Sequence, residues 1–386
     1  MADDLSNLRN RLDAIDARIV AALADREAVI EAVADAKRAG AGVVRDPRRE
    51  SELLTRLVQR GRAAGLDGYY VARVFREVID HSLRLQQSRL STGPDRDRPL
   101  RLGHLGTVGS WSHRAAEQFG SGHPAGVDLE GFGAFVDMVE AVEARRLDAA
   151  VLPLENTTAG SVREAWELLA SHPVHLIGEE FVRVEHRLVG LADATAEGVR
   201  RVYSHPQALA QCTRALRAMG AELVPVSDTA EAVARVAREQ DPSHAAVASR
   251  RAADEHGLVV LRDGVANAPD TWTRFVVVSH SVVTYDPRIP SKTSIVIATR
   301  HEEGALLACL NVLAEHHLSL TKLESRPRPE TPFEYLFYID FEGHGADGAV
   351  REALRQLEHH TSFVKVLGSY PARRTPAARP VDAPAD

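Results

Sequence analysis

Apolar residues recur at steps of three and four along the first forty residues, the spacing typical of a helix with one apolar face. The repeat includes Leu5, Leu8, Leu12 and Ile15, and neither glycine nor proline interrupts it between residues 5 and 38. Such a helix is about 50 Å long, too long for its apolar face to be buried within a domain of about 90 residues. We therefore expect it to pack against a partner, namely a second copy of the chain.

Two further helices are predicted after this one. Asp46 is a good N-cap and Pro47 fits the first helical position of the second helix, and a third helix covers about residues 69–89. Residues 91–99 are rich in proline, glycine and charged side chains, which is typical of a linker. The pattern therefore predicts an all-helical domain over residues 1–90.

From residue 100 the pattern changes to short apolar strands that alternate with helices, which indicates an α/β domain with a mostly parallel sheet. A helix leads into residues 148–151, and a similar helix leads into residues 244–247. Two similar lobes with a cleft between them would explain the similarity of these two segments. We therefore predict a two-lobed α/β domain, like the periplasmic binding proteins, over residues 100–285.

The last part of the chain shows a third pattern. Residues 291–371 have the order strand, helix, strand, strand, helix, strand, which predicts an α+β domain of βαββαβ type. Residues 372–386 are rich in proline, alanine and arginine and carry too little apolar side chain to fold, so a disordered tail is expected.

Composition narrows the class of protein. A chain of 386 residues, 44% hydrophobic, is expected to form two or three domains, and its net charge of -7 offers no basic surface for nucleic acid. Cys212 and Cys309 are far apart and lack a metal-ligand spacing, which argues against a disulfide scaffold or a zinc site. No apolar run approaches the roughly 18 residues of a membrane span. We expect a cytoplasmic protein without metal, cofactor or membrane partner.

Several charged residues of the helical region can converge on one ligand. Arg26 and Lys37 lie about 20° apart around a helix and about 16 Å apart along it, so both can reach one small dianion. Arg9 lies about 26 Å along the axis from Arg26, so it would serve the partner's site. Further polar residues share helix faces at close spacing, although a solvated surface would explain any one of them alone. These residues are Asp46, Arg49 and Glu50 on one helix, and Ser82 and Gln86 on the next.

Over residues 5–90 the sequence resembles the all-helical bacterial chorismate mutases. The resemblance implies that all of these polar residues bind the substrate, with Arg9 supplied by the other protomer. Rearranging chorismate to prephenate moves no proton, so the enzyme holds the compact conformer and stabilises charge on the breaking ether oxygen. Arginines suit the two carboxylates of the substrate, and Lys37 with Gln86 suits the ether oxygen.

Four stretches of the α/β region lie where strands begin or end. They are the glycine-rich residues 103–112, Glu-Asn-Thr-Thr-Ala-Gly at 155–160, Tyr-Ser-His-Pro-Gln at 203–207 and Thr-Trp-Thr-Arg-Phe at 271–275. The first can cradle an anion at a helix N-terminus, but its spacing is not that of a nucleotide-binding loop. Alone, each is better explained as a turn with capping residues. Strand ends of open α/β sheets are, however, where ligands bind.

Together these stretches resemble prephenate dehydratases over roughly residues 100–280. The resemblance implies that Thr273 takes part in catalysis and that Glu155, Asn156 and Gln207 line the cleft. Arg274, at the mouth of the same strand as Thr273, is expected to grip the doubly acidic substrate. The leaving hydroxide needs a proton, and a threonine hydroxyl is a weak acid. Glu155, with its pKa raised by burial, therefore remains a rival donor, with Thr273 positioning the leaving oxygen.

Three further residues bear on the shape of this site. Thr107 stands where the dehydratases usually have proline, and Trp111 where they have tyrosine or phenylalanine, which affects the pocket floor and the substrate preference. His205 precedes a proline in a tight turn and is expected to be structural.

The C-terminal region carries two more motifs. Gly304, Ala305, Leu306 and Leu307 open a helix, and Glu324, Ser325, Arg326 and Pro327 close a strand. Both motifs resemble the phenylalanine-binding stretches of the ACT domain attached to these dehydratases, where the amino acid sits at a subunit interface. The resemblance implies feedback inhibition, which requires phenylalanine to favour a less active arrangement.

Taken in order, the three regions resemble the bifunctional chorismate mutase/prephenate dehydratases of phenylalanine biosynthesis. This implies chorismate, prephenate and phenylalanine as ligands and a homodimer or larger homo-oligomer. Two alternatives remain open. One is an enzyme on the same scaffold that acts on arogenate or decarboxylates prephenate without aromatising it, although Thr273 argues against the decarboxylase. The other is a non-enzymatic amino-acid sensor, which would not need the polar residues of the helical region.

Overall fold

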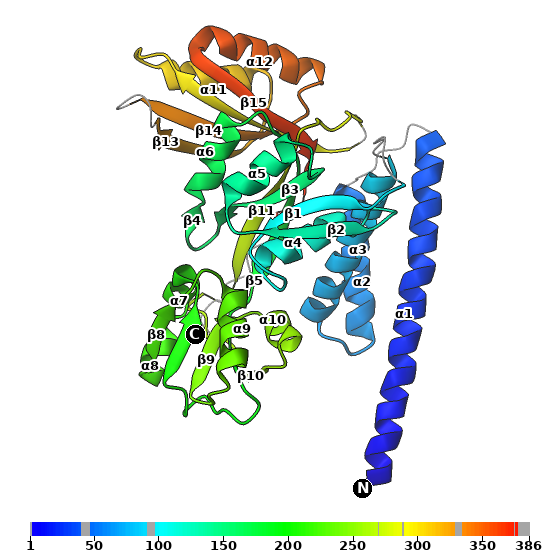
Figure 1. Ribbon diagram of the computed structural model, residues 1–386. Helices are drawn as coiled ribbons and strands as arrows, with labels where there is room; N and C mark the ends of the chain where they lie inside the picture. Colours follow the sequence, from blue (N-terminus) through cyan, green and yellow to red (C-terminus); the bar gives the residue numbers. More distant parts are fainter. Residues whose placement is uncertain are drawn as a thin grey trace, which may run out of the picture. The chain divides into compact units, whose positions relative to one another are not determined.

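The computed structural model describes residues 2–39, 47–90, 97–268, 270–287, 289–328, 334–373 and 375–376. The chain divides by its internal contacts into two units, each described here by itself (Figure 1). The first consists of Met1–Asp95 with Thr284–Pro290, and the second of Arg96–Val283 with Ser291–Asp386.

The first unit contains the three predicted helices, α1 (Ala2–Ala39), α2 (Pro47–Ala63) and α3 (Gly68–Leu90). Helix α3 packs against both α1 and α2. Gly61 permits the close packing of α2 on α3, because a Cβ there would lie 2.5 Å from Val71 Cγ2. Asp67 begins α3 by accepting a hydrogen bond from the backbone N–H of Tyr70.

Most of the apolar face of α1 is not covered within this unit. Ala34 near its C-terminal end is buried, whereas Leu12 is 59% exposed and Ile19 is 53% exposed. Leu8, Ile15 and further apolar residues along the same helix are also exposed. The arrangement is the one expected of a helix that needs a partner, but the structure contains a single chain.

The second unit begins with a sheet that forms the first lobe of the α/β region, with strand order β2-β1-β3-β11-β5 and β4 paired to β3. Its strands are β1 (Leu100–Leu105), β2 (Val127–Phe132), β3 (Ala149–Asn156), β4 (Gly160–Ser161), β5 (His175–Val184) and β11 (Thr271–Ser279). Its helices are α4 (Trp111–Gly120), α5 (Phe135–Glu143) and α6 (Arg163–Ser171).

Alternating residues of these strands pack on helices at both faces of the sheet. Ala150 and Val276 belong to the core that α5 and α6 contribute to, whereas Val151 and Phe275 pack with residues of α4. The strands are therefore apolar on both faces, which explains their continuous apolar runs.

The second lobe is a separate sheet with order β10-β6-β9-β7-β8. Its strands are β6 (Arg187–Gly190), β7 (Arg201–Ser204), β8 (Glu222–Pro225), β9 (His244–Ala248) and β10 (Val259–Arg262). Its helices are α7 (Pro206–Gln211), α8 (Thr213–Met219), α9 (Thr229–Glu239) and α10 (Arg250–Glu255). Side chains cap α9 and α10, with Asp228 and Ser249 accepting backbone N–H groups of the first turn.

The chain crosses between the lobes twice, after β5 and before β11, so the predicted two-lobed α/β arrangement is observed. The expectation of mostly parallel sheets is wrong. Strand β11 returns from the second lobe and runs antiparallel to both β3 and β5, and β6 runs antiparallel to both β9 and β10.

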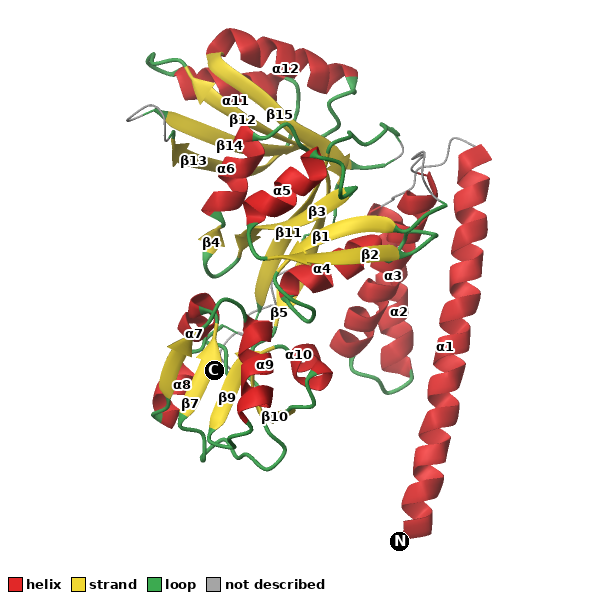
Figure 2. Cartoon of the chain, in the orientation of Figure 1, coloured by secondary structure: helices red, strands yellow, loops and turns green. Residues whose placement is uncertain are grey.

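The C-terminal part of the second unit has the predicted βαββαβ order. It comprises β12 (Ser291–Thr299), α11 (Ala305–Glu315), β13 (Leu320–Pro327), β14 (Tyr335–Glu342), α12 (Gly348–His360) and β15 (Thr361–Pro371). The antiparallel sheet has order β13-β14-β12-β15, and Figure 2 shows α11 and α12 along one of its faces. We call these elements the C-terminal domain.

The other face of this sheet packs against the first lobe. Tyr338 lies with its ring 4.6 Å from that of Trp166 on α6, and both belong to one continuous core. Strand β15 approaches β5 so closely that a Cβ at Gly368 would lie 2.2 Å from the carbonyl oxygen of Leu176. Only glycine permits this contact between backbones. Among the described residues, no helix is both long and apolar enough to cross a membrane.

Candidate active sites

In the first unit, three of the predicted ligands lie together between α1 and α3. The guanidinium of Arg26 donates hydrogen bonds to Ser82 Oγ and to the carbonyl oxygen of Val78, the latter at 3.3 Å. Ser82 and Gln86 lie one turn apart on α3 and are 4% and 6% exposed. Burial lowers the pKa of Arg26. A partly buried cation thus lies beside two buried polar side chains, an arrangement that suits a small anion.

The other predicted ligands of this unit are not brought to the same place. Arg9 lies on an exposed stretch of α1 about 26 Å along the helix axis from Arg26, so one chain cannot bring the two together. Arg49 and Glu50 lie in the first turn of α2, exposed and half-buried respectively. The side chain of Lys37 and the whole of Asp46 lie outside the described residues.

In the second unit, Thr273 and Asn156 meet at the edge of the first lobe. They are partners in the register of β11 and β3, and both are buried. Asn156 Nδ2 donates a hydrogen bond of 2.9 Å to Thr273 Oγ1. Asn156 Oδ1 accepts the backbone N–H groups of Thr158 and Ala159, each at 3.0 Å, so the amide is held in one orientation.

The second lobe contributes two residues that the sequence analysis did not single out. Gln211, at the end of α7, donates from Nε2 to Asn156 Oδ1 at 3.2 Å. Gln211 Oε1 lies 2.7 Å from His186 Nε2, and since an amide oxygen only accepts, this ring nitrogen carries a proton. Gln211 follows Gln207 by four residues on α7, so helical spacing from the motif at 203–207 was the signal that could have found it.

His205 and Gln207 lie at the start of the same short helix. His205 Nδ1 accepts the backbone N–H of Gln207 at 3.2 Å, which makes His205 the N-cap of α7, the structural role expected for it. Gln207 lies in the first turn of α7 with an exposed side chain.

The glycine-rich residues 103–112 face the second lobe. Gly109 has a φ of +85°, a backbone conformation that favours glycine, and a Cβ there would lie 2.6 Å from Glu255 Oε2 of the second lobe. Ser110 caps α4 by accepting the N–H of His113, and the Trp111 ring lies 6.5 Å from that of His186. Thr107 contributes its carbonyl oxygen to a turn, which proline would also supply.

An ion pair also joins the lobes. Arg251 of α10 binds both carboxylate oxygens of Glu117 on α4, one of them at 2.7 Å. The lobes are thus joined by this ion pair as well as by the Asn156–Gln211 hydrogen bond.

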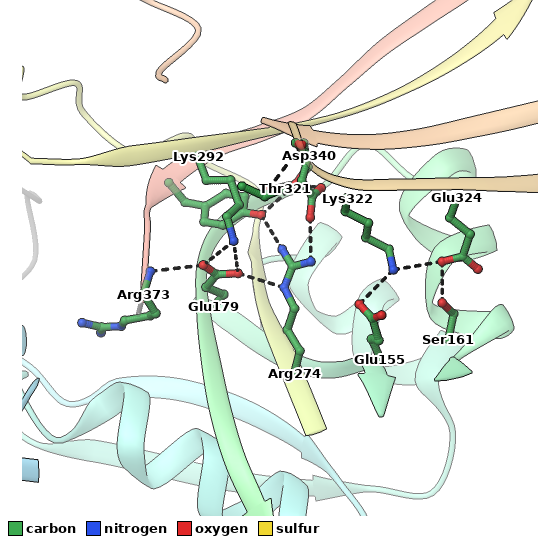
Figure 3. A network of polar contacts seen from close by, with 12 residues as sticks. Glu155, Ser161, Glu179, Arg274, Lys292, Thr321, Lys322, Glu324, Asp340 and Arg373 are labelled. Carbon is green, nitrogen blue, oxygen red and sulfur yellow. Dashed lines mark hydrogen bonds and ion pairs between the residues drawn. The ribbon is translucent and has the colours of Figure 1, made fainter. Parts of the chain in front are cut away.

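Arg274 points to the opposite face of the sheet from Thr273. It is 7% exposed, and its guanidinium donates to Glu179 at 2.8 Å, Asp340 at 2.6 Å and the Tyr370 hydroxyl at 2.9 Å (Figure 3). Burial opposes its charge, but Asp340, Tyr370 and Glu179 together raise the pKa of Arg274. Successive strand residues point to opposite faces, so Arg274 faces the C-terminal domain. The expectation that it grips the substrate is therefore corrected.

Glu155 lies on the same far face, opposite Arg274 in the register of the two strands. Its carboxylate accepts from Lys322 Nζ at 2.8 Å, and Lys322 also pairs with Glu324 at 3.0 Å (Figure 3). Glu324 in turn accepts from Ser161. Because Glu155 faces away from Thr273 and is paired with Lys322, the structure corrects the expectation that it lines the site as a rival acid.

Two stretches of this chain match known families. Residues 8–87 match the family described as chorismate mutase type II, and residues 102–282 match the family described as prephenate dehydratase. The bifunctional chorismate mutase/prephenate dehydratase of Escherichia coli (strain K12) is 34% identical over 95% of both chains. The chain belongs to the bifunctional chorismate mutase/prephenate dehydratase family. It therefore carries both activities of phenylalanine biosynthesis, an isomerase and a lyase, as the sequence indicated.

Solved structures resemble a large part of this bifunctional enzyme. A prephenate dehydratase of Arthrobacter aurescens, in complex with L-Phe, has a TM-score of 0.63 at 28% identity, over 71% of this chain and 90% of that one. GqqA, described as a novel type of quorum quenching acylase, has a TM-score of 0.62 at 31% identity, over 71% of this chain and 98% of that one.

The two predicted phenylalanine-binding motifs of this bifunctional enzyme occupy different surroundings. Gly304 has a φ of +76° before α11, and Leu307 in the first turn is 61% exposed. The motif 324–327 lies on the edge strand β13, where Glu324 and Arg326 are paired at 2.7 Å. Ser325 and Pro327, which alternate with these charged residues, are exposed.

Proposed function

We propose that Thr273 assists the departure of the prephenate hydroxyl in the cleft between the two lobes. The observation that carries this is the hydrogen bond from Asn156 Nδ2 to Thr273 Oγ1. Because this oxygen accepts from an amide, the hydroxyl proton of Thr273 is available for another partner. The partner we assign is the leaving oxygen of the substrate.

The chemistry then needs little from the protein. The C–O bond to the leaving hydroxyl and the C–C bond to the ring carboxylate break, and the electron pair of the C–C bond completes the aromatic ring. The leaving oxygen takes the proton of Thr273 and departs as water, the carboxylate leaves as carbon dioxide, and Thr273 regains a proton from solvent after the products have left. Partial negative charge left on Thr273 Oγ1 is stabilised by Asn156, in a site where water is largely excluded.

The test uses both activities of one chain. Thr273→Val removes the hydroxyl but keeps the shape of the side chain, and phenylpyruvate formation from prephenate should then fall at least about a hundredfold, as for loss of a group that assists proton transfer. Mutase activity of the same variant, measured from chorismate, should be unchanged. Substantial phenylpyruvate formation by Thr273→Val would refute this assignment. Repeating the assay with arogenate decides between the two substrates.

We also propose that the mutase site is completed by a second copy of the chain. Arg26, Ser82 and Gln86 form one part of it, with Lys37, Asp46, Arg49 and Glu50 as further ligands. Arg9 would come from the partner, because it lies too far along α1 from Arg26 to reach the same ligand. The exposed apolar residues of α1 support this proposal, since they provide a surface for a partner helix, in a homodimer or a larger assembly.

We further propose that the C-terminal domain is an ACT domain that binds phenylalanine and inhibits the dehydratase. The site would be formed by residues 304–307 and 324–327. Support comes from the relative solved in complex with L-Phe, and from the apolar side chains of Leu307 and Leu323, which are 61% and 46% exposed beside the two motifs. Gly304→Ala and Ser325→Ala should weaken inhibition. Dehydratase activity indifferent to millimolar phenylalanine would count against this role.

A further inference from the structure

A continuous series of hydrogen bonds joins three side chains, His186, Gln211 and Asn156, to Thr273. His186 Nε2 lies 2.7 Å from Gln211 Oε1, Gln211 Nε2 lies 3.2 Å from Asn156 Oδ1, and Asn156 Nδ2 lies 2.9 Å from Thr273 Oγ1. His186 lies between β5 and β6, where the polypeptide first crosses from one lobe to the other. The series of hydrogen bonds therefore begins where the polypeptide crosses between the lobes, passes through Gln211 of the second lobe, and ends at Thr273 of the first lobe.

The direction of every bond in this chain follows from two backbone groups. The N–H groups of Thr158 and Ala159 can only donate, so the atom of Asn156 that faces them is its oxygen. The nitrogen of Asn156 therefore faces Thr273. Gln211 must present its own nitrogen to the same Asn156 oxygen, which leaves the Gln211 oxygen facing His186. His186 completes the series by donating from Nε2.

The surroundings of His186 favour a neutral, buried ring. The residue is 5% exposed, and burial lowers the pKa of its imidazole, so the ring is neutral near pH 7 although the bond to Gln211 acts in the opposite direction. Its Nδ1 is buried, with no hydrogen-bond partner among the described residues. Gln211 and Asn156 separate the ring from Thr273 along the hydrogen bonds, so His186 does not donate to Thr273 directly.

We propose that His186 is a positioning residue of the dehydratase reaction. Its Nε2–H group fixes the Gln211 amide, Gln211 holds Asn156 across the cleft, and the chain as a whole keeps the Thr273 proton directed at the substrate. The bond between Gln211 and Asn156 crosses from one lobe to the other, so the alignment is complete only when the lobes are together. This inference rests on the catalytic role proposed for Thr273.

Three substitutions separate donation by Nε2 from simple packing. His186→Gln places an amide N–H close to the position of Nε2, His186→Asn places one near Nδ1, and His186→Leu provides none. With the asparagine and leucine variants we expect kcat on prephenate to fall about tenfold, the loss of one buried hydrogen bond, with KM changed less than about twofold. The glutamine variant should restore kcat to within about threefold of the wild type. Mutase activity of the same chains should be unchanged in all three.

Other roles of His186 predict other results. A proton donor would be lost in the glutamine variant as fully as in the leucine variant, and the pH profile of kcat would change. A purely structural residue would show the same kcat in all variants that fold, or equal losses in all three. Each of these outcomes overturns the inference. Combining His186→Leu with Gln211→Leu should cost no more than Gln211→Leu alone, because both act through one chain.

Thr273→Val distinguishes failure of this inference from failure of the proposed function. If Thr273→Val abolishes phenylpyruvate formation and His186→Leu has wild-type kcat, only the role of His186 is wrong. If Thr273→Val remains active, the catalytic assignment itself is wrong, and the inference falls with it.

Discussion

Glu155 and Lys322 form an ion pair of 2.8 Å that joins strand β3 of the dehydratase part to strand β13 of the C-terminal domain. The next residue after Glu155 is Asn156, which holds Thr273 on the opposite face of the sheet. Arg274, the neighbour of Thr273, is likewise held by Asp340 of the C-terminal domain. The C-terminal domain thus contacts both β3 and β11, at the residues next to Asn156 and Thr273.

The first prediction concerns this ion pair and regulation. Lys322→Met removes the ammonium group that pairs with both Glu155 and Glu324. For a partly exposed pair worth about 0.5–1 kcal/mol, the phenylalanine concentration for half inhibition should rise roughly two- to fivefold. Arg163→Gln, which removes an exposed ion pair of α6 with Glu167, is the matched control and should leave inhibition as it is. If phenylalanine inhibits Lys322→Met and the wild type equally, the Glu155–Lys322 ion pair has no part in the inhibition.

The second prediction tests the placement of Arg274. Arg274→Met leaves Glu179 and Asp340 buried with one cation fewer, and should lower the free energy of unfolding of the second unit by about 3–5 kcal/mol, measured by urea denaturation. A residue that bound substrate would behave differently. Its loss would raise KM for prephenate and leave the unfolding transition in place.

The third prediction concerns stability and pH. Burial lowers the pKa of His104, which is 2% exposed and packs edge to face on His113 at 4.8 Å. The folded protein therefore binds this proton less readily than the unfolded chain, where the imidazole has its usual pKa of about 6.5. Stability should be fully present above that pH and should fall as the pH is lowered through it.

The measurement is the free energy of unfolding as a function of pH between 8 and about 5, in wild type and in His104→Gln. Neighbouring groups also act, since His113 lowers the pKa of His104 and Glu117 raises it. The variant should therefore show a shallower fall rather than none. A steeper fall in His104→Gln would contradict the sign of the effect.

The fourth prediction concerns the exposed face of α1. Ile15→Lys places a charge in the middle of the apolar stripe and should dissociate the proposed assembly, lowering mutase activity at least about tenfold at micromolar protein by mass action. Dehydratase activity at low phenylalanine should be retained. Asp13→Lys, on the opposite side of the helix, is the control. Sedimentation equilibrium of both variants gives the mass, and an active monomeric Ile15→Lys would show that one copy suffices.

The regular elements could be predicted because their patterns are local. The spacing of Leu5, Leu8 and Leu12 indicates a helix whatever it packs against, and the βαββαβ order of the C-terminal domain follows from short runs of apolar residues. The two lobes were indicated by the similar segments at residues 148–151 and 244–247. The antiparallel course of β11 was not, because the direction of a returning strand depends on pairing with residues more than a hundred positions away.

The errors at the site have a simple physical origin. Thr273 and Arg274 are adjacent, as are Glu155 and Asn156, and adjacent residues of a strand point to opposite faces. Thr273 and Arg274 could therefore not both face the same site, and neither could Glu155 and Asn156. Which member faces the cleft depends on what covers the other face, and Asp340 and Lys322, which decide it, lie far along the chain.

The shared core of Trp166 and Tyr338 has a consequence for engineering this protein. A regulatory module joined only by a tether could be cut off or exchanged for another. Here, truncation before Ser291 would expose Trp166 to solvent and leave Glu179 without Lys292, so the shortened enzyme should precipitate rather than escape the proposed inhibition by phenylalanine. Desensitised variants are better sought by point substitution than by deletion.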